Sequence, residues 1–402
     1  MGKTGTPRRK PGRMGPHVEG FRDSLLASGY APGSVRHMLT DMGGLGRWMD
    51  RQDIAACDLD PAVIGEFLSD LRVSGRRRLP GARSLIPLLN YLRSAGVLAE
   101  QAAPSTPLEM LMADYHRWLV VDRGLVGPTV LRYENLAHRF LLERVCEDGS
   151  DFVAKLTGAH VIAFLLQEST RVSVGAAKGR VAELRSLLRF LYLTGRTPLP
   201  LATAVPPVAG WRDTGVPFGI TAGDVQRLLD SCDRTSPVGV RDFAILLLVA
   251  RLGLRSAEVA RLELGDIDWR SGQISVRGKG RREDQLPLPR DVGEALTAYL
   301  TTARPATPLR HVFLSCKAPV RGIRPDLVSD VTRRACDRAG LPRVGAHRLR
   351  HALATEMLRR GAALVEVSQV LRHRDLATTA IYAKVDVDRL RTVAQPWPGA
   401  VR

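Results

Sequence analysis

Hydrophobic residues along this chain recur mainly with the three-to-four-residue spacing of amphipathic helices. Two stretches, residues 17–100 and 106–196, keep this periodicity and lack the alternation that is typical of strands. Each stretch is therefore predicted to form a helical bundle. Beyond residue 218, apolar helical stretches alternate with short strand-like pieces. This second pattern predicts a mostly helical α+β domain over residues 218–402.

The two predicted bundles are similar to each other in sequence. Three landmarks of the first recur in the second, at offsets of 95, 98 and 99 residues. The landmarks are Gly29–Val35 with Gly124–Val130, Ala62–Leu68 with Val161–Leu165, and Leu88–Gly96 with Leu187–Gly195. We interpret the repeat as an internal duplication in which a hydroxyl, Ser34 or Thr129, caps the helix that follows a turn. A chance likeness between two ordinary amphipathic bundles is the alternative.

Two further segments lack a helical or strand period. Residues 1–16 hold five basic residues and no acidic one, which predicts a flexible basic tail that lies along phosphates or stays solvated. Residues 197–217 contain five prolines and are predicted to be a linker.

The last domain carries clear local signals. Thr221 is predicted to cap the helix that opens it. Residues 273–276 and 285–288 are predicted to pair as an antiparallel hairpin with Gly-Lys-Gly at its tip, and residues 311–314 are predicted to add a third strand.

Composition narrows the class of protein. Hydrophobic residues make up 45% and charged residues 25% of the 402 positions, which is typical of a folded globular chain and excludes a disordered or fibrous one. The longest apolar run, Phe243 to Ala250, is far too short to span a bilayer, and no N-terminal segment has the apolar core of a signal peptide. The five cysteines form no CxxC pair, which argues against a disulfide framework or a zinc knuckle. We therefore expect a cytoplasmic protein without a membrane partner.

The charge balance points to a polyanionic partner. Lys and Arg number 59 against 41 Asp and Glu, a net charge of +18, and such an excess in a folded chain usually serves nucleic acid. Only seven of the 59 basic residues are lysines, a ratio that codon bias in a GC-rich genome also produces. The retained lysines, Lys178 and Lys279 among them, are candidates for roles that need an ammonium group.

Six residues of the last domain carry the functional groups of a metal-free phosphoryl transfer. They are Arg255, Lys279, His347, Arg350, His373 and Tyr382. A phenol can attack a phosphodiester, arginines can stabilise charge on its non-bridging oxygens, and a lysine or histidine can move protons. Taken singly, Arg255 also fits a surface ion pair, His373 a helix cap and Tyr382 a core aromatic.

A metal site is the competing interpretation of the histidines. His347 and His351 are four residues apart, a spacing that can bind zinc. However, Arg348 stands where a metalloprotease helix carries its glutamate, and no third ligand is evident. We therefore expect neither a metal nor a cofactor.

Four segments resemble the tyrosine recombinase, or phage integrase, family. They read LGLRSAEV, VRGKGRREDQLPL, HRLRHALAT and LRHRDLATTAIYAKV, in this order over residues 252–385. The segment DRGLVGPTVLRYENLAHRFL is similar to the family's core-binding domain. The resemblance thus covers about residues 106–390, and residues 17–100 look like an additional module. It implies a mainly helical fold with a small antiparallel sheet, in which two N-terminal SAM-like bundles precede an α+β catalytic domain.

The resemblance assigns roles around a scissile DNA phosphate. Arg255 and Arg350 would bind that phosphate, His373 would donate a hydrogen bond to it, and Tyr382 would form a 3′-phosphotyrosine bond. At one position the chain departs from the family, because Arg372 stands where a helix-ending glycine is usual. That departure concerns the local geometry of a helix end and not the chemical groups of the site.

The remaining roles concern protons and support. By resemblance, Lys279 would protonate the leaving 5′ oxygen, His347 would act as base or proton relay, and Glu258 would support the geometry of the site. The candidate DNA contacts are Arg281 and Arg282, next to the lysine, and Lys178 in the second bundle. The alternative for the two arginines is a solvent-exposed face that contacts no DNA.

The function implied is that of a site-specific DNA recombinase or integrase that integrates, excises or transposes a mobile element without metal or ATP. Its partners would be double-stranded DNA and three further protomers, so that a tetramer, with or without related recombinases, acts on two sites in the bacterial cytoplasm at the nucleoid. Two alternatives stay open. They are a type IB topoisomerase-like relaxation of supercoils and a non-catalytic DNA-binding regulator of the same fold.

Overall fold

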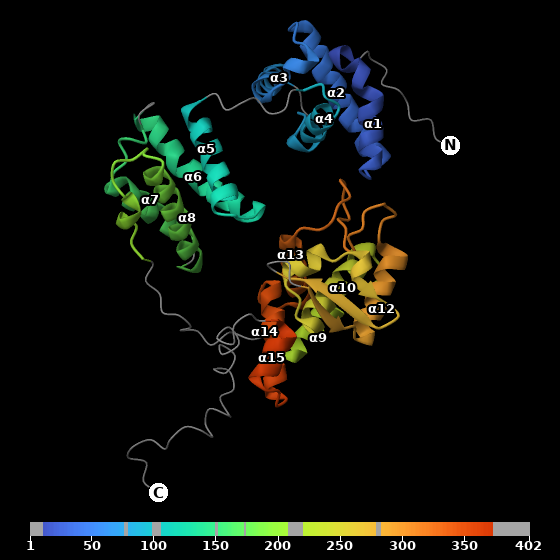
Figure 1. The fold of residues 1–402 in the computed structure, drawn as a ribbon. Coiled ribbons are helices and arrows are strands. Elements are labelled where there is room, and N and C mark those ends of the chain that lie inside the picture. The colour runs from blue at the N-terminus through green and yellow to red at the C-terminus, as the bar shows by residue number, and fades with distance from the viewer. Residues whose placement is uncertain are drawn as a thin grey trace. The chain divides into compact units, whose positions relative to one another are not determined.

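The structure, a computed structural model, describes residues 11–75, 79–98, 106–148, 152–172, 174–207, 220–278 and 283–372 (Figure 1). Helices dominate these residues, and one three-stranded antiparallel sheet accompanies them. The predicted fold class, mainly helical with a small antiparallel sheet, is therefore confirmed. Within the described residues no helix combines the length and apolar character needed to cross a membrane.

The first bundle packs around its own apolar core. Phe21, Trp48, Phe67 and Leu92 are buried in it, and the indole of Trp48 donates a hydrogen bond to Asp70 at 2.7 Å. The described elements are a 3-10 turn η1 (Gly12–His17), α1 (Val18–Ala27), α2 (Pro32–Arg51), a short turn η2 (Ala56–Asp58), α3 (Pro61–Val73) and α4 (Ala82–Ser94). Because Met14 in η1 is fully buried, the packed bundle begins near residue 12, inside the stretch assigned by sequence to the tail.

The second bundle repeats this order of helices around a separate core. Phe140, Phe164 and Leu188 lie at its centre. The described elements are α5 (Pro107–Arg117), a π-helical turn η3 (Trp118–Asp122), α6 (Gly127–Asp148), α7 (Gly158–Arg171), α8 (Val174–Leu193) and a 3-10 turn η5 (Leu201–Ala204). Leu201 and Val205 are buried in this core, so packed structure extends into the stretch assigned to the linker.

The duplication seen in sequence recurs in the backbone. Equivalent turns place glycine at positive φ in both copies: Gly29 with Gly124, and Gly96 with Gly195. The predicted hydroxyl caps of the helices after these turns are wrong. Ser34 and Thr129 do not cap α2 and α6, because these helices begin two residues earlier, at Pro32 and Gly127. Proline in a first helical turn, with its fixed φ and missing N–H, sets the start instead.

Two buried carboxylates distinguish the second bundle from the described part of the first. Glu183 on α8 is contacted by Arg132 at 2.6 Å and Arg180 at 2.9 Å. Glu168 on α7 is contacted by Arg139 at 2.8 Å, and Arg180 lies 3.6 Å from it. Pairing with arginines offsets the cost of burying these two side chains.

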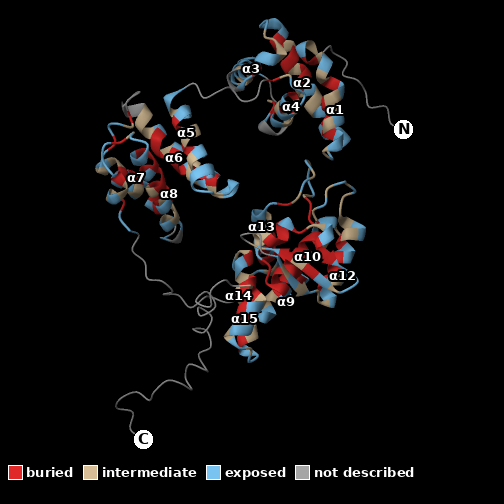
Figure 2. Cartoon of the chain, in the orientation of Figure 1, coloured by how far each residue is buried: buried red, intermediate tan, exposed pale blue. Residues whose placement is uncertain are grey.

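The C-terminal domain is built around α10, which is buried along almost its whole length (Figure 2). Thr221 caps α9 as predicted, accepting a hydrogen bond from the N–H of Asp224 at 3.1 Å. The described elements are α9 (Ala222–Asp230), α10 (Pro237–Leu252), α11 (Ser256–Arg261), η6 (Leu264–Asp266), β1 (Ile267–Asp268), β2 (Gln273–Arg277), β3 (Glu283–Pro287), α12 (Arg290–Ala298), η7 (Tyr299–Ala303), α13 (Pro325–Ala339), α14 (Ala346–Arg359) and α15 (Leu364–Leu371).

The sheet has the order β1-β2-β3, and β2 pairs with β3 in the predicted antiparallel hairpin. The third strand is β1, so the prediction of a strand at residues 311–314 is wrong. That segment makes only isolated bridges at His311 and Leu314. Val312, Phe313 and Leu314 are all buried, and the N–H of Leu314 is taken by the hydroxyl of Tyr299. Its other backbone bonds go to two separate segments, since Val312 donates to the carbonyl of Leu262 and Ile323 donates to the carbonyl of Phe313.

Alanine substitutions at two glycines of α2 should change the stability of the first bundle in opposite directions. A Cβ on Gly44 meets nothing within 4 Å, whereas a Cβ on Gly46 would lie 2.1 Å from the carbonyl oxygen of Pro11. Gly44→Ala should stabilise the first bundle by about 0.5–1 kcal/mol through the lower entropy of the unfolded chain. Gly46→Ala should destabilise it by about 1–3 kcal/mol because η1 must move away.

Hydrogen exchange of the amides in η1 and α2, measured on the full-length chain, would report both effects. These amides should exchange more slowly than in wild type in Gly44→Ala, because the helix is stabilised, and faster in Gly46→Ala, because η1 is displaced. Equal effects of the two substitutions would contradict this prediction.

Candidate active site

Arg255 stands at the junction of α10 and α11. The chain leaves α10 through Gly253, whose φ of 57° is left-handed, and Arg255 then occupies the N-cap position of α11. A Cβ on this glycine would come within 2.8 Å of Leu371, so only glycine fits both the turn and the packing. The Arg255 side chain is 42% exposed, which allows its guanidinium to reach a ligand.

Glu258, one turn into α11, holds this arginine in two ways. One carboxylate oxygen accepts from the backbone N–H of Arg255 at 2.8 Å, and the other accepts from its guanidinium at 2.7 Å. Burial raises the pKa of Glu258, but the charge of Arg372 and the hydrogen bonds from Arg255 outweigh burial and leave this pKa below its ordinary value. The carboxylate is therefore ionised at neutral pH.

Arg350 is buried at the centre of the cluster, with only 1% of its surface exposed. It lies on α14, and its guanidinium donates to the carbonyl oxygens of Gly253 and Leu371. These carbonyls lie at the ends of α10 and α15. A carbonyl at the end of a helix has no N–H partner within that helix. Arg350 thus ties three helices of the C-terminal domain together; α14 and α15 lie next to each other in Figure 1.

His347 precedes Arg350 by three residues and shares its face of α14, as the sequence predicts. Its side chain reaches the surface, yet partial loss of water lowers the pKa of this imidazole below 6.5, and the charges of Arg350 and Arg255 lower it further. The ring is therefore neutral at physiological pH and can accept a proton. It stacks edge-on against His351, with ring centroids 4.3 Å apart.

Arg372 is a member of the cluster that sequence reasoning missed. It ends α15 at a φ of 53°, so the backbone keeps the left-handed geometry of the usual glycine. Its guanidinium donates to Glu258 at 2.7 Å, and its carbonyl accepts from the guanidinium of Arg255 at 3.2 Å. The signal was present as an arginine in a glycine position, but the direction of the side chain is a tertiary property.

These residues together form a candidate anion site. The cluster contains three guanidinium groups, from Arg255, Arg350 and Arg372, against the single carboxylate of Glu258. Since the neighbouring imidazole is neutral, two positive charges remain without an opposite charge inside the cluster. Forked donors with excess positive charge suit an oxyanion such as a phosphate.

Other candidate residues are not brought to this cluster by the described structure. Lys279, Arg281 and Arg282 belong to the connection between β2 and β3, and His373 and Tyr382 follow α15. All five lie outside the described residues. Lys178 is described and lies on the exposed side of α8 in the second bundle. Among the described residues no three His, Cys, Asp or Glu side chains converge in a way that could hold a metal ion.

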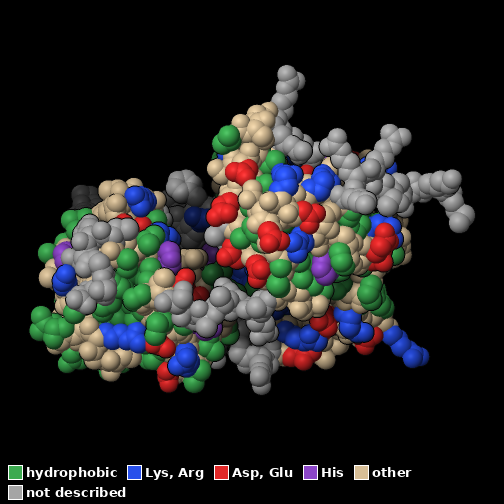
Figure 3. All heavy atoms as spheres, turned by 90° about the horizontal axis from the view of Figure 1, so that it is seen from above, with side chains coloured by type: hydrophobic (Ala, Val, Ile, Leu, Met, Phe, Trp, Pro, Cys, Tyr) green, Lys and Arg blue, Asp and Glu red, His purple; other side chains and the backbone are tan. Residues whose placement is uncertain are grey.

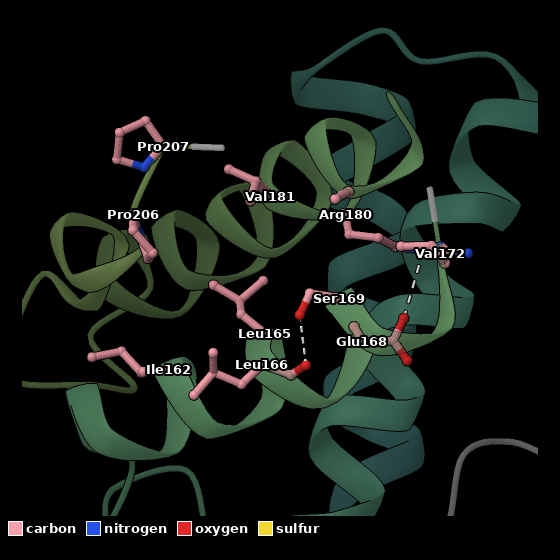
Figure 4. Close-up of a pocket in the computed structure, with 11 residues that line it drawn as sticks. Ile162, Leu165, Leu166, Glu168, Ser169, Val172, Arg180, Val181, Pro206 and Pro207 are labelled. Carbon is pink, nitrogen blue, oxygen red and sulfur yellow. Dashed lines mark hydrogen bonds and ion pairs between the residues drawn. The ribbon is translucent and has the colours of Figure 1, made fainter. Parts of the chain in front are cut away.

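A cavity of about 160 Å³ lies in the second bundle, between α7, α8 and the segment that ends at Pro207 (Figure 4). Its walls are mostly apolar, with Ile162, Leu165 and Val181 among them. The one carboxylate in its lining, Glu168, is engaged by arginines. The arginine in its lining, Arg180, is paired with Glu168 and Glu183, so the cavity has no excess of positive charge like that of the Arg255 cluster.

Known proteins resemble the chain in sequence and in fold. Residues 219–389 match the family described as "Phage integrase family". A protein of Sinorhizobium fredii named "Putative integrase/recombinase y4rA" is 42% identical over 399 residues, 98% of this chain and 96% of that one. "Tyrosine recombinase XerC" of Oceanobacillus iheyensis is 31% identical over 304 residues, 71% of this chain and 94% of its own.

The solved structure titled "Crystal structure of a lambda integrase dimer bound to a COC' core site" shares the fold, with a TM-score of 0.54 at 15% identity. The match covers 85% of this chain and 89% of that one. Identity with a relative over nearly the whole length settles the family. The chain belongs to the phage integrase family of tyrosine recombinases.

Proposed function

We propose that this protein is a site-specific DNA recombinase that cleaves and rejoins strands through a 3′-phosphotyrosine at Tyr382. The observation that carries the proposal is the cluster in which Arg255, Glu258, His347 and Arg350 meet from α11 and α14 with excess positive charge. These are the described members of the residue set that the family's chemistry requires.

In the proposed reaction the phenolic oxygen of Tyr382 attacks the scissile phosphorus. The bond from phosphorus to the 5′ oxygen breaks, and the phenolic proton passes to His347, which is neutral in the free protein. Arg255 and Arg350 stabilise the charge on the non-bridging oxygens, while His373 donates a further hydrogen bond. Lys279 protonates the leaving 5′ oxygen. Rejoining reverses these steps, so the reaction needs neither a metal nor ATP.

The distribution of charge supports DNA as the substrate. Basic residues outnumber acidic ones by 31 to 20 over residues 218–402, but only by 22 to 20 over residues 17–196. On the face shown in Figure 3, basic and acidic side chains are interspersed. Phosphates would then be held at discrete points, Arg281, Arg282 and Lys178 among them, and affinity would fall steeply with salt.

The relatives support DNA as the partner and the proposed division of the chain. Solved relatives are titled as complexes with DNA, including a dimer on a core site and a transposon integrase with a circular intermediate. XerC matches 71% of this chain, whereas y4rA matches 98%. We therefore assign residues 17–100 to an additional module, residues 106–196 to core-site binding and residues 218–402 to catalysis. A tetramer on two DNA sites would integrate, excise or transpose a mobile element, in the cytoplasm at the nucleoid.

Covalent trapping tests the chemistry. Wild-type protein incubated in EDTA with a nicked suicide substrate, made from the ends of the element that carries the gene, should form an adduct that survives denaturation. Tyr382→Phe should form none, because the phenyl ring lacks the attacking oxygen. Gel electrophoresis of the labelled DNA after denaturation measures the result.

The two alternatives give different outcomes in the same assay. DNA binding without an adduct in wild type would favour a non-catalytic regulator and contradict the proposal. Relaxation of supercoiled plasmids of any sequence, without joining of two sites, would instead indicate topoisomerase-like activity.

The lowered pKa of His347 predicts how the stability of the protein and the titration of this imidazole depend on pH. Because the folded chain binds this proton less tightly than the unfolded chain, His347 contributes stability above pH 6.5 that is lost as the pH falls. An NMR titration of the 15N-histidine-labelled protein, with the signal assigned by its loss in His347→Gln, should give a midpoint below 6.5. Arg255→Gln should move that midpoint upward, since one repelling charge is removed. A wild-type midpoint at or above 6.5 would contradict the proton-accepting role.

A further inference from the structure

Arg372 combines an unfavourable backbone with an inward side chain. Among the described residues, Asp53 and Arg372 are the non-glycine residues at positive φ. A side chain in this conformation brings Cβ close to a carbonyl oxygen, which is why glycine usually ends a helix in this way. A residue that only ended α15 would be better as glycine. The arginine must therefore contribute through its side chain.

The side chain of Arg372 is held inside the anion site. It is 6% exposed, and its guanidinium donates to Glu258 at 2.7 Å and to the carbonyl of Val370 at 3.2 Å. An arginine at a helix end can reach solvent easily, because its stem is long and flexible. This one instead spans from the end of α15 to α11.

Two separate contacts connect Arg372 to Arg255. The first passes through Glu258, whose one carboxylate oxygen accepts both from the guanidinium of Arg372 and from the backbone N–H of Arg255. The second is direct, since the carbonyl oxygen of Arg372 accepts from the guanidinium of Arg255 at 3.2 Å. Arg255 is therefore gripped at its backbone and at its side chain by one charged unit.

We propose that Arg372 is a positioning residue, which sets the orientation of the phosphate-binding Arg255 through the Glu258 carboxylate and through its own carbonyl. The proposal rests on the proposed function of this site. It assigns a role to a residue that departs from the family pattern, in place of the helix-ending glycine.

The physical reason is the state of the buried carboxylate. Burial favours the neutral form of Glu258, and the positive charge of Arg372 is the strongest effect that opposes it. Without Arg372, Glu258 would take up a proton at a higher pH. A protonated carboxyl turns one oxygen into a donor, which cannot accept from Arg255. Arg255 would then lose part of its support as the pH falls.

The charged and titratable groups around this carboxylate are few among the described residues. Arg255 contacts it from the start of α11 and Arg372 from the end of α15. On α14, His347 and Arg350 lie close enough to Arg255 for their charges to interact with one another. The share of any change in the pH profile that passes through Glu258 is the part that disappears when Arg372 is removed in a Glu258→Gln background.

The test compares Arg372→Gly and Arg372→Lys with wild type in the suicide-substrate assay at saturating protein. Arg372→Gly should slow adduct formation about 10- to 100-fold, because a misplaced binding group costs that much. DNA affinity should change less than about threefold, since most phosphate contacts lie elsewhere. The acidic limb of the rate–pH profile should move to higher pH. Arg372→Lys, which keeps the charge without the fork, should restore part of the rate.

Two controls separate positioning from a structural effect. Asp53→Gly relieves the same kind of backbone strain at an exposed residue of the first bundle and should leave the cleavage rate unchanged. In a Glu258→Gln background, adding Arg372→Gly should cost much less than in wild type, because the coupled partner is already gone. If Arg372→Gly fails to fold, judged by hydrogen exchange in α10, the lysine variant decides on its own by an intermediate rate at unchanged affinity.

The outcomes separate failure of this inference from failure of the proposed function. An active wild type together with Arg372→Gly and Arg372→Lys variants of unchanged rate and pH profile would overturn the positioning role alone. Full additivity with Glu258→Gln would overturn it as well. A wild type that binds DNA without forming an adduct would instead overturn the proposed function on which the inference rests.

Discussion

The guanidinium of Arg350 is the group on which the arrangement of the anion site depends. A buried cation must give its N–H groups to acceptors, because an uncompensated charge in the interior costs several kcal/mol. Arg350 uses the carbonyls of Gly253 and Leu371, at the ends of α10 and α15. The chain turns left-handed directly at or after these two carbonyls, at Gly253 and Arg372. The same interaction that satisfies the buried charge thus brings the residues after both helices to Glu258.

This arrangement leaves the site electrostatically incomplete. Glu258 is shared between Arg255 and Arg372, so one carboxylate compensates two cations while a third, Arg350, is buried beside them. An excess of buried positive charge is tolerated because the acceptors are fixed carbonyls and the packing of α10 supplies stability elsewhere. An anionic ligand such as the phosphate of the proposed reaction would supply the missing negative charge. Burial is the main cause of the lowered pKa of His347, and the neighbouring arginines lower this pKa further because they also repel a proton.

Much of the site could be predicted because it is local in sequence. His347 and Arg350 share a helix face by spacing alone, and Glu258 reaches back to Arg255 within one turn. The hairpin between β2 and β3 followed from its turn residues. The side chain of Arg372 could not be predicted, because its direction depends on a carboxylate 114 positions earlier. The strand predicted at residues 311–314 is wrong for a related reason: a short apolar run is typical of a buried strand, but whether it joins a ladder depends on partners distant in sequence. The helices α2 and α6 begin at Pro32 and Gly127, so the backbone preference of the residues before the hydroxyl, and not a hydroxyl cap, determines where they start.

The two bundles show how a duplicated scaffold acquires different surfaces. They keep the same order of helices and the same left-handed glycines, which fix the turns. Their charges are placed differently. In the first bundle Arg13 pairs with Asp50 and Asp53 on the surface, whereas in the second Glu168 and Glu183 are buried and hold partly exposed arginines from beneath. A buried carboxylate restricts the rotamers of the arginines above it, so their N–H groups are presented at fixed positions. Among the described residues, buried carboxylates hold arginines in the second bundle and not in the first, so the two similar bundles differ in how firmly their surface arginines are positioned.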